Sequence, residues 1–238
     1  MKKTMMALAI VGVVGAVAAQ AADPWAPTLN LGVSVTDGNT DTLGVNLGLV
    51  AGVGTAEDGN HARVTADWNY GEVDGDNTVQ NTEAKLVYER TLSDVSYAYA
   101  SAGILNDSIA RVSYRVPVSL GIGYLAWQDA AARLILEAGP AYVWEKVAGD
   151  KDDYFALRFA QSYFRALSET ARIFQSLEYI PQASDFDNYL LNFEIGAEAA
   201  LNANAALRVV FKNRYDNEPA PDAKKNDLQL LAGLAYRL

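Results

Sequence analysis

The sequence predicts an all-β fold: a transmembrane, antiparallel, up-and-down β-barrel of about 12 strands, preceded by a cleaved signal peptide. Apolar and polar residues alternate along most of the chain, turn residues interrupt this alternation at regular intervals, and an export signal precedes it. A period of two over a long segment indicates a strand with one apolar face. The pattern is clear in the last segment, where one parity is apolar throughout: Leu228, Leu230, Ala232, Leu234, Tyr236 and Leu238.

That last segment also predicts how the barrel closes. An aromatic residue near the end, followed by an apolar terminal residue, is typical of the final strand of outer-membrane barrels. Tyr236 and Leu238 match this pattern, although Leu238 replaces the commoner Phe. If this strand closes a barrel, the rest of the chain must supply many more strands and must be exported first.

The N-terminus has the features of a secretory signal. Lys2 and Lys3 form a basic region, residues 5–19 are apolar or small, and Ala19-Gln20-Ala21 offers a cleavage site. We therefore expect residues 1–21 to be a signal peptide and residues 22–238 to form one outer-membrane β-barrel domain. An uncleaved membrane anchor is the alternative, but the apolar run is shorter than the roughly 20 residues of a transmembrane helix.

Composition narrows the classes of function. The absence of cysteine from the 238 residues excludes disulfides, thiolate metal sites and cysteine nucleophiles. The formal net charge is −10; removal of Lys2 and Lys3 from the 19 basic residues leaves 17 against 29 acidic ones, a net charge of −12. Such an acidic chain argues against nucleic acid as a partner and suits a surface or an interior that prefers cations.

The alternation divides the chain into strands joined by turn residues, with no linker and no repeat beyond the hairpin. Asp37-Gly38-Asn39 and Asp74-Gly75-Asp76-Asn77 are turns by their chemistry, because Gly and Asn tolerate positive φ. Phe174 and Gln175 obscure the phase within residues 154–180. The expected strands cover residues 29–36, 42–51, 62–70, 81–92, 95–104, 112–124, 133–142, 154–167, 171–180, 189–201, 207–214 and 227–238.

Strand length and loop length predict how the barrel lies in the membrane. Strands of roughly ten residues cross a bilayer when tilted by about 45°. An even number of strands brings both termini to the periplasmic side. We expect short periplasmic turns at 93–94 and 202–204, and longer extracellular loops at 73–78, 147–153 and 216–226.

A soluble β-sandwich also alternates, so the position of charge decides between the two folds. The polar parity often has Gly, Ser, Asn, Asp or Arg at mid-strand, and Tyr and Trp stand toward strand ends on the apolar parity. This suits a wet lumen and aromatic girdles better than a two-sheet core. Pro117 and Pro140 lie within neighbouring strands, where each removes a ladder donor, and we expect a bulge or a broken bond at each.

Several segments, taken in their order and spacing, resemble the YdiY-like group of salt-induced outer-membrane proteins, a domain family of unknown function. The resemblance covers essentially the whole mature chain. It implies an outer-membrane location and a barrel, and it implies no established activity. The segments are Gly38-Asn39-Thr40, Tyr114-Arg115-Val116, Gly121-Ile122-Gly123-Tyr124, Leu134 to Pro140, Lys224-Lys225-Asn226-Asp227 and Gly233-Leu234-Ala235-Tyr236-Arg237.

Charged residues on the polar parity are the candidate functional residues, because they should point into the lumen. They either form a network of ion pairs that fills a narrow barrel, or line a small pore and select a solute. Both readings stay open, since about 12 strands enclose more space than a filled eight-stranded barrel and less than an open porin. The residues are Asp67, Glu83, Lys85, Glu89, Arg115, Arg133, Glu137, Arg158, Glu194, Glu198, Arg208, Lys212 and Arg214.

The sequence offers little for catalysis or metal binding. His61 is the only histidine, and a lipid acyl-hydrolase would need it on the lipid-facing side with a serine partner. It stands instead beside a periplasmic turn, on the parity of Arg63. Asp74 to Asn77 and Asp150 to Asp153 could offer oxygens to Ca²⁺, but neither has a full loop signature, and turn chemistry explains them.

We therefore expect a non-enzymatic, monomeric barrel of the cell outer membrane without a cofactor. Its partners would be outer-membrane lipids, periplasmic chaperones, the barrel-assembly machinery, and small solutes or cations. The expected activity is a narrow diffusion pore linked to salt or osmotic adaptation. A structural barrel with an ion-pair-filled lumen is the alternative, and a lipid acyl-hydrolase using His61 is a remote one.

Overall fold

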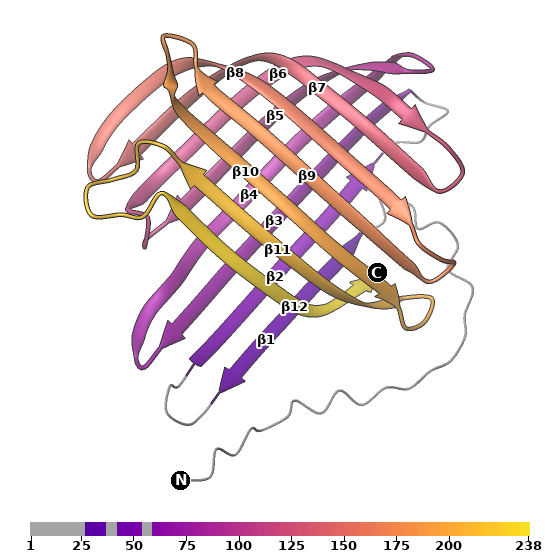
Figure 1. Cartoon of the computed structure of the whole chain (residues 1–238), viewed down its shortest axis with the longest axis horizontal. Coiled ribbons are helices and arrows are strands. Elements are labelled where there is room, and N and C mark those ends of the chain that lie inside the picture. The colour runs from indigo at the N-terminus through magenta and orange to yellow at the C-terminus, as the bar shows by residue number, and fades with distance from the viewer. Residues whose placement is uncertain (1–26, 37–41, 54–58) are drawn as a thin grey trace.

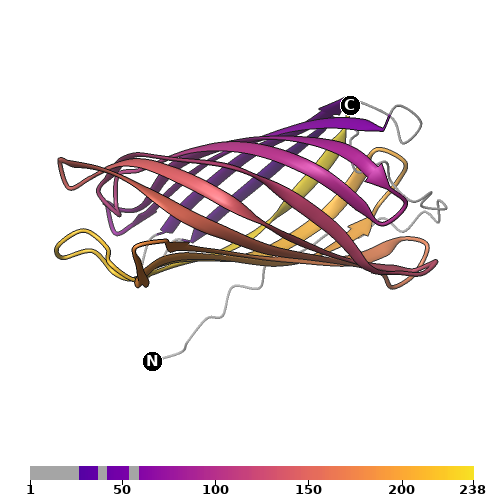
Figure 2. The ribbon, with the colours of Figure 1, turned by 90° about the horizontal axis from the view of Figure 1, so that it is seen from above.

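The computed structural model describes residues 27–36, 42–53 and 59–238, in which twelve antiparallel strands close into a barrel (Figures 1 and 2). The predicted signal peptide, residues 1–21, and the Asp37-Gly38-Asn39 turn lie outside the described residues. The strands are β1 (Thr28–Thr36), β2 (Thr42–Val53), β3 (Asn60–Val73), β4 (Asp76–Ser93), β5 (Ser96–Asp107), β6 (Val112–Gln128), β7 (Ala132–Val147), β8 (Asp150–Ala166), β9 (Ala171–Gln182), β10 (Asp185–Ala200), β11 (Ala205–Asp216) and β12 (Asn226–Arg237).

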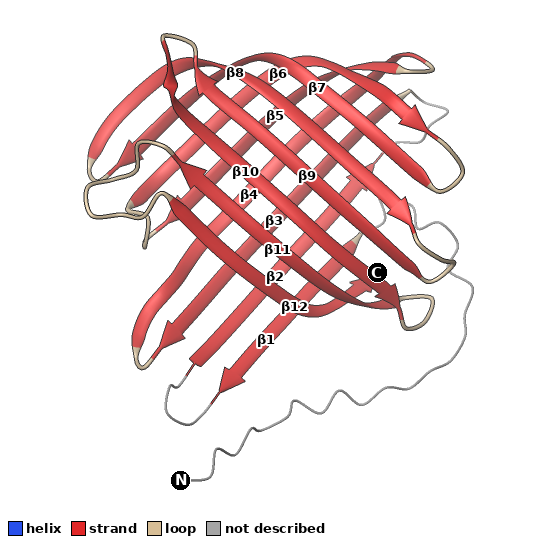
Figure 3. Ribbon diagram, viewed as in Figure 1, coloured by secondary structure: helices blue, strands red, loops and turns tan. Residues whose placement is uncertain are grey.

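Each strand pairs with the strand before it in the chain, and β12 closes the ring by pairing with β1. The closing register joins Thr28 to Arg237 and Leu31 to Leu234. The predicted all-β barrel and the closing role of the last segment are confirmed. Figure 3 shows strands joined by short connections, and no helix in the described part of the chain is long and apolar enough to span a membrane.

Every strand except β1 is longer than the predicted ten residues, and two predicted loops are wrong. β4 has 18 residues and β1 has 9. The segments expected as loops at 73–78 and 147–153 are two-residue turns, because β3 and β4 meet at Asp74-Gly75 and β7 and β8 meet at Ala148-Gly149. All four turn residues have positive φ, from 50° to 99°. Such turns match strand twist, so pairing continues up to the hairpin tip. The third expected loop remains, as residues 217–225.

The outer face is apolar in the way that a lipid-facing surface requires. Leu31, Leu230 and Ile195, on the outward parity of β1, β12 and β10, have exposed side chains. One belt of outward aromatic residues lies toward the loop end, and a second lies toward the end with the termini. The first comprises Trp68, Tyr70, Tyr142, Trp144, Tyr179, Tyr189 and Tyr215, and its rings are in contact within the groups Trp68–Tyr70, Tyr142–Trp144 and Tyr179–Tyr189–Tyr215. The second comprises Tyr88, Tyr124, Trp127, Tyr163 and Tyr236.

The prolines interrupt the sheet without shifting its register. The β5–β6 ladder pairs Ala102 with Val118 and next pairs Leu105 with Arg115, on either side of Pro117. The β6–β7 ladder likewise passes from Ser119↔Ala141 to Ile122↔Ala138, on either side of Pro140. Each proline therefore breaks the ladder on one side, as the missing N–H requires, rather than forming a bulge.

The structure assigns the faces of β8 and β9, which the sequence left unclear. Phe164 pairs with Phe174 and Ala160 with Glu178, so the even-numbered residues of both strands face inward. Gly196 leaves room for the inward ring of Phe174, because a Cβ on Gly196 would lie 2.3 Å from that ring. Gln175 then points outward.

Part of the interior is an apolar core near the loop end. The inward residues there come from β7 to β10 and are buried together, with Val143 wholly inaccessible. This patch fills one side of the barrel, so the polar interior is narrower than the strand number alone suggests. Its members are Ala141, Val143, Tyr154, Ala156, Ile180 and Leu190.

Candidate functional site: the charged interior of the barrel

The inward parity brings most of the predicted charged residues together in ion pairs. Eleven of the thirteen take part: Asp67, Glu83, Lys85, Arg115, Glu137, Arg158, Glu194, Glu198, Arg208, Lys212 and Arg214. Glu89 and Arg133 take part in none of these pairs; Glu89 stands opposite His61 in the β3–β4 register, and Arg133 is exposed at the start of β7.

Several ion pairs join strands that are far apart in the sheet, so they cross the enclosed space. Lys85 Nζ on β4 lies 2.9 Å from Glu178 Oε1 on β9. Arg214 Nη2 on β11 lies 2.5 Å from Glu83 Oε2 on β4. In each case the two strands stand five places apart in a ring of twelve, one short of diametrically opposite. The interior is therefore bridged from wall to wall by charged side chains.

Arg158 on β8 is the centre of one cluster. Its Nη1 lies 2.9 Å from Glu137 Oε2, and its Nε lies 2.6 Å from Glu178 Oε1. The guanidinium stacks over the Tyr99 ring at 5.0 Å, and the Tyr97 hydroxyl donates to Glu137 at 2.6 Å. Arg158 is buried, so its two carboxylate partners supply the compensation that a buried charge requires.

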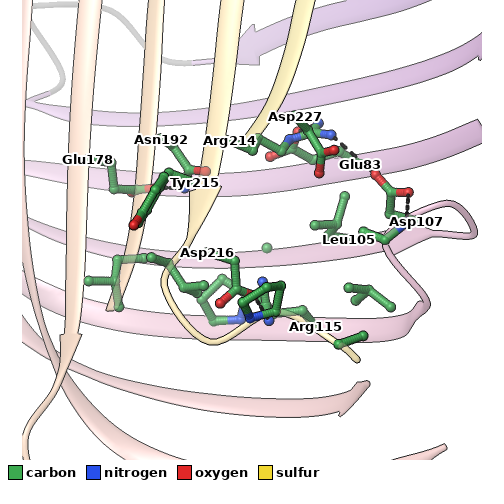
Figure 4. Close-up of a pocket in the computed structure, with 18 of the residues that line it drawn as sticks. Glu83, Leu105, Asp107, Arg115, Glu178, Asn192, Arg214, Tyr215, Asp216 and Asp227 are labelled. Atoms are coloured by element: carbon green, nitrogen blue, oxygen red, sulfur yellow. Dashed lines mark hydrogen bonds and ion pairs between the residues drawn. The ribbon is translucent and has the colours of Figure 1, made fainter. Parts of the chain in front are cut away.

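Arg115 on β6 forms a second cluster beneath the long loop. Its Nε lies 2.5 Å from Glu145 Oε2, and its Nη2 lies 2.7 Å from Asp216 Oδ2 on β11, across the barrel. Arg115 and Asp216 border a cavity of about 80 Å³. Figure 4 shows this cavity, with Arg115 and Asp216 on one side and Arg214, Glu83, Asp107 and Asp227 on the other.

The loop at residues 217–225 reaches over this cavity. Pro219 and Ala220 line it, and Ala220 is buried. The Arg111 guanidinium, in the turn between β5 and β6, donates a hydrogen bond of 3.1 Å to the Pro221 carbonyl. Because that turn lies on the far side of the ring from β11 and β12, the loop narrows this mouth of the barrel.

A ladder of asparagines lines another part of the wall. Asn46 Nδ2 donates to Asn69 Oδ1 at 2.7 Å, and Asn69 Nδ2 donates to Asn81 Oδ1 at 2.8 Å. The three stand at register partners on β2, β3 and β4. Asn69 is almost fully buried, so its amide must be satisfied by these neighbours.

The interior also holds larger cavities on the side of the termini. A cavity of about 210 Å³ is lined by residues of β1 to β4 and of β10 to β12. Another, of about 660 Å³, opens among the turns at the end where the termini lie, and Arg172, Glu198 and Arg237 line it. Polar and charged groups line both, which is the environment that a hydrophilic solute requires.

Sequence reasoning missed several inward residues of these clusters. It missed Arg172 and Glu178 because the phase of β9 was unclear, and Glu145 because the predicted strand ended at residue 142. It missed Asp216 because the loop was expected to begin there. Continuing the inward–outward alternation a few residues beyond the predicted ends of β7 and β11 would have placed Glu145 and Asp216 on the inward face.

The structure adds no support for catalysis or metal binding by the remaining candidate residues. His61 falls on the parity of Arg63 and Asp67, the inward one, whereas a lipid hydrolase would need it facing lipid. Asp74 forms a hairpin turn and Asp150 to Asp153 belong to β8. Within residues 27–36, 42–53 and 59–238, no group of His, Asp and Glu could hold a metal ion.

Comparison with solved structures shows the same fold in known porins. The NanC porin superposes with a TM-score of 0.54 at 11% identity, covering 90% of this chain and 100% of that one. The KdgM porin in complex with disordered oligogalacturonate gives a TM-score of 0.51 at 10% identity, covering 89% and 99%. No curated protein matches the sequence.

A family model described as "Protein of unknown function, DUF481" matches residues 29–238. The match begins one residue into β1 and extends through β12, so it spans every strand of the barrel. This chain therefore belongs to the DUF481 family.

Proposed function

We propose that this protein is a narrow outer-membrane pore for small hydrophilic solutes, constricted at rest by ion pairs that cross its interior. One observation carries the proposal. The closed barrel has an apolar exterior and encloses polar cavities, and ion pairs that cross the interior, such as Arg214–Glu83, stand between these cavities. The fold shared with two porins supports it.

The outer membrane is the membrane that this architecture suits, because closed barrels with aromatic belts are the spanning form found there. We infer that the protein is exported with cleavage of residues 1–21, is inserted into the membrane by the barrel-assembly machinery, and is a monomer. No catalytic step belongs to this proposal. This proposal predicts that a His61→Ala variant keeps the barrel properties of wild type and loses no lipid-hydrolysing activity.

The same ion pairs supply a physical link to salt. Screening lengths fall from about 10 Å at 0.1 M to about 3 Å at 1 M ionic strength. The long pairs around Lys212, at 3.7 and 3.8 Å, border a cavity and should weaken first. We therefore propose that the constriction relaxes as ionic strength rises, which fits a role in salt or osmotic adaptation.

Planar-bilayer conductance of the refolded protein tests the proposal. Wild type should give small discrete steps, and reversal potentials in a salt gradient should show a cation preference that Glu194→Gln with Glu198→Gln weakens. Arg214→Gln combined with Glu83→Gln removes a crossing pair without changing net charge, and should raise conductance. Arg172→Gln with Glu198→Gln, which removes a pair between neighbouring strands near the wide mouth, is the charge-matched control.

A non-conducting structural barrel is the second candidate, because the crossing pairs and the loop at 217–225 both narrow the path. It predicts a heat-modifiable, folded protein that stays silent in the bilayer. If neither wild type nor the Arg214→Gln, Glu83→Gln double variant conducts in the bilayer, the pore is excluded and the structural role remains.

A further inference from the structure

The cavity of about 210 Å³ is the place in the barrel best suited to hold a solute. It is lined by Asn30, Asn46 and Asp67 on β1 to β3 and by Glu194 and Lys212 on β10 and β11. The lining strands form one continuous arc of the ring, from β10 through β12 and β1 to β4, and the two ends of this arc stand six places apart in the ring of twelve. A molecule in this cavity would therefore contact residues from both ends of the arc.

The charges around this cavity are paired more loosely than those of the Arg158 and Arg115 clusters. Lys212 Nζ lies 3.8 Å from Asp67 Oδ2 and 3.7 Å from Glu194 Oε2, and Arg208 Nη2 lies 3.5 Å from Glu194 Oε1. Charge-assisted hydrogen bonds normally measure about 2.7–2.9 Å. Glu194 and its two partners stand on the neighbouring strands β10 and β11, and only the contact between Lys212 and Asp67 crosses the cavity. Because none of these contacts is shorter than 3.5 Å, each of the four side chains keeps capacity for another partner.

The charges of the cavity are balanced, which decides the class of solute. Glu83 also lines it, but that carboxylate is held by Arg214 at 2.5 Å. Two cationic groups, Arg208 and Lys212, then remain against two anionic ones, Asp67 and Glu194. A solute with a single charge would pair with one sign and leave the other in surplus. A solute with one charge of each sign can pair with both and keep the interior neutral.

Neutral groups complete the site. The guanidinium of Arg208 stacks over the Phe174 ring at 4.7 Å, which holds its donors in place. Asn30 and Asn46 also line the cavity and add neutral polar groups to its wall.

We propose that this cavity is a binding site for small zwitterions that carry an ammonium and a carboxylate group, such as a free amino acid. Arg208 and Lys212 receive the carboxylate, and Asp67 and Glu194 receive the ammonium. The inference names the solute class of the proposed pore and so rests on that proposed function, but the binding it describes is an equilibrium property that can be measured without conduction.

The test is calorimetric titration of the detergent-folded protein with glycine, and with acetate and methylamine as matched single-charge probes. Glycine should bind saturably, and each single-charge probe about tenfold or more weakly. Lys212→Gln and Glu194→Gln should each weaken glycine binding about tenfold. Arg172→Gln, an interior charge change outside this cavity, should leave it unchanged, with circular dichroism and gel heat-modifiability showing that all variants fold.

The possible outcomes distinguish a failure of the zwitterion site from a failure of the proposed pore. Absence of glycine binding, equal binding of acetate or of methylamine, or equal loss in Arg172→Gln overturns the zwitterion site. Bilayer steps without glycine binding leave the pore standing and remove the site. Glycine binding without any conductance leaves the site standing and removes the pore.

Discussion

Glu178 is the residue at which the ion-pair account of the interior can be tested most sharply. Its carboxylate lies 2.9 Å from Lys85 Nζ and 2.6 Å from Arg158 Nε, and it also accepts a hydrogen bond of 3.3 Å from Asn192. Glu178→Gln removes the charge and nearly preserves the volume. Lys85 and Arg158 then remain as two cations with only Glu137 beside them.

The expected cost follows from burial. The Glu178 side chain is 18% exposed and that of Arg158 is 8% exposed. Breaking a buried pair by removing one partner costs about 3–5 kcal/mol, because the remaining charge is left uncompensated. Glu198→Gln breaks the pair with Arg172, whose side chain is 30% exposed, and should cost only about 1 kcal/mol or less.

A double variant supplies the control for lost packing. Lys85→Met with Glu178→Gln removes one charge of each sign and leaves Arg158 paired with Glu137. It should therefore be more stable than Glu178→Gln alone, which simple loss of contacts does not predict. Equilibrium unfolding in lipid vesicles, followed by tryptophan fluorescence, measures all four proteins. If Glu178→Gln costs no more than Glu198→Gln, the interior is solvated at this level and the constriction argument is wrong.

Three further changes test other parts of the structure. Replacing the loop at 217–225 with a short turn should raise single-channel conductance about twofold or more by widening that mouth, and no change would mean that the loop does not limit flow. Gly139→Ala should destabilise the barrel by about 1–3 kcal/mol, because the added Cβ would lie 2.0 Å from the Leu120 carbonyl oxygen, whereas Gly103→Ala, with 3.4 Å to its nearest atom, should be close to neutral in the same unfolding assay. Asn69→Ala should cost about 1–3 kcal/mol by leaving both neighbours in the amide ladder without a partner, and an unchanged midpoint would show that water replaces it.

The face of each regular strand was readable from local pattern. The alternation in β12 and in β10 assigned apolar residues to the outside and Gln229, Glu194 and Glu198 to the inside, and the pairing agrees. This works because successive side chains of a strand point to opposite faces wherever the strand stands in the sheet. The number of strands followed from the same periodicity.

Other features needed the register between strands. The Phe174 ring has room inside the barrel because Gly196 lies beside it, and no feature of the β9 sequence alone shows that neighbour. The hairpins at Asp74-Gly75 and Ala148-Gly149 extend further than expected because paired strands remain favourable outside the bilayer, so membrane thickness does not set strand length.

The sequence by itself determined the fold class, the closing strand and the inward face of the charges on the regularly alternating strands. The tertiary structure alone decided which of those charges meet: Lys85 reaches Glu178 over 93 positions, and Arg214 reaches Glu83 over 131. Closure of the ring sets these encounters, because it places strands five steps apart on nearly opposite walls. Local periodicity carries no information on that distance, and so the clusters, the cavities and the loop over the mouth appear only when the barrel is closed.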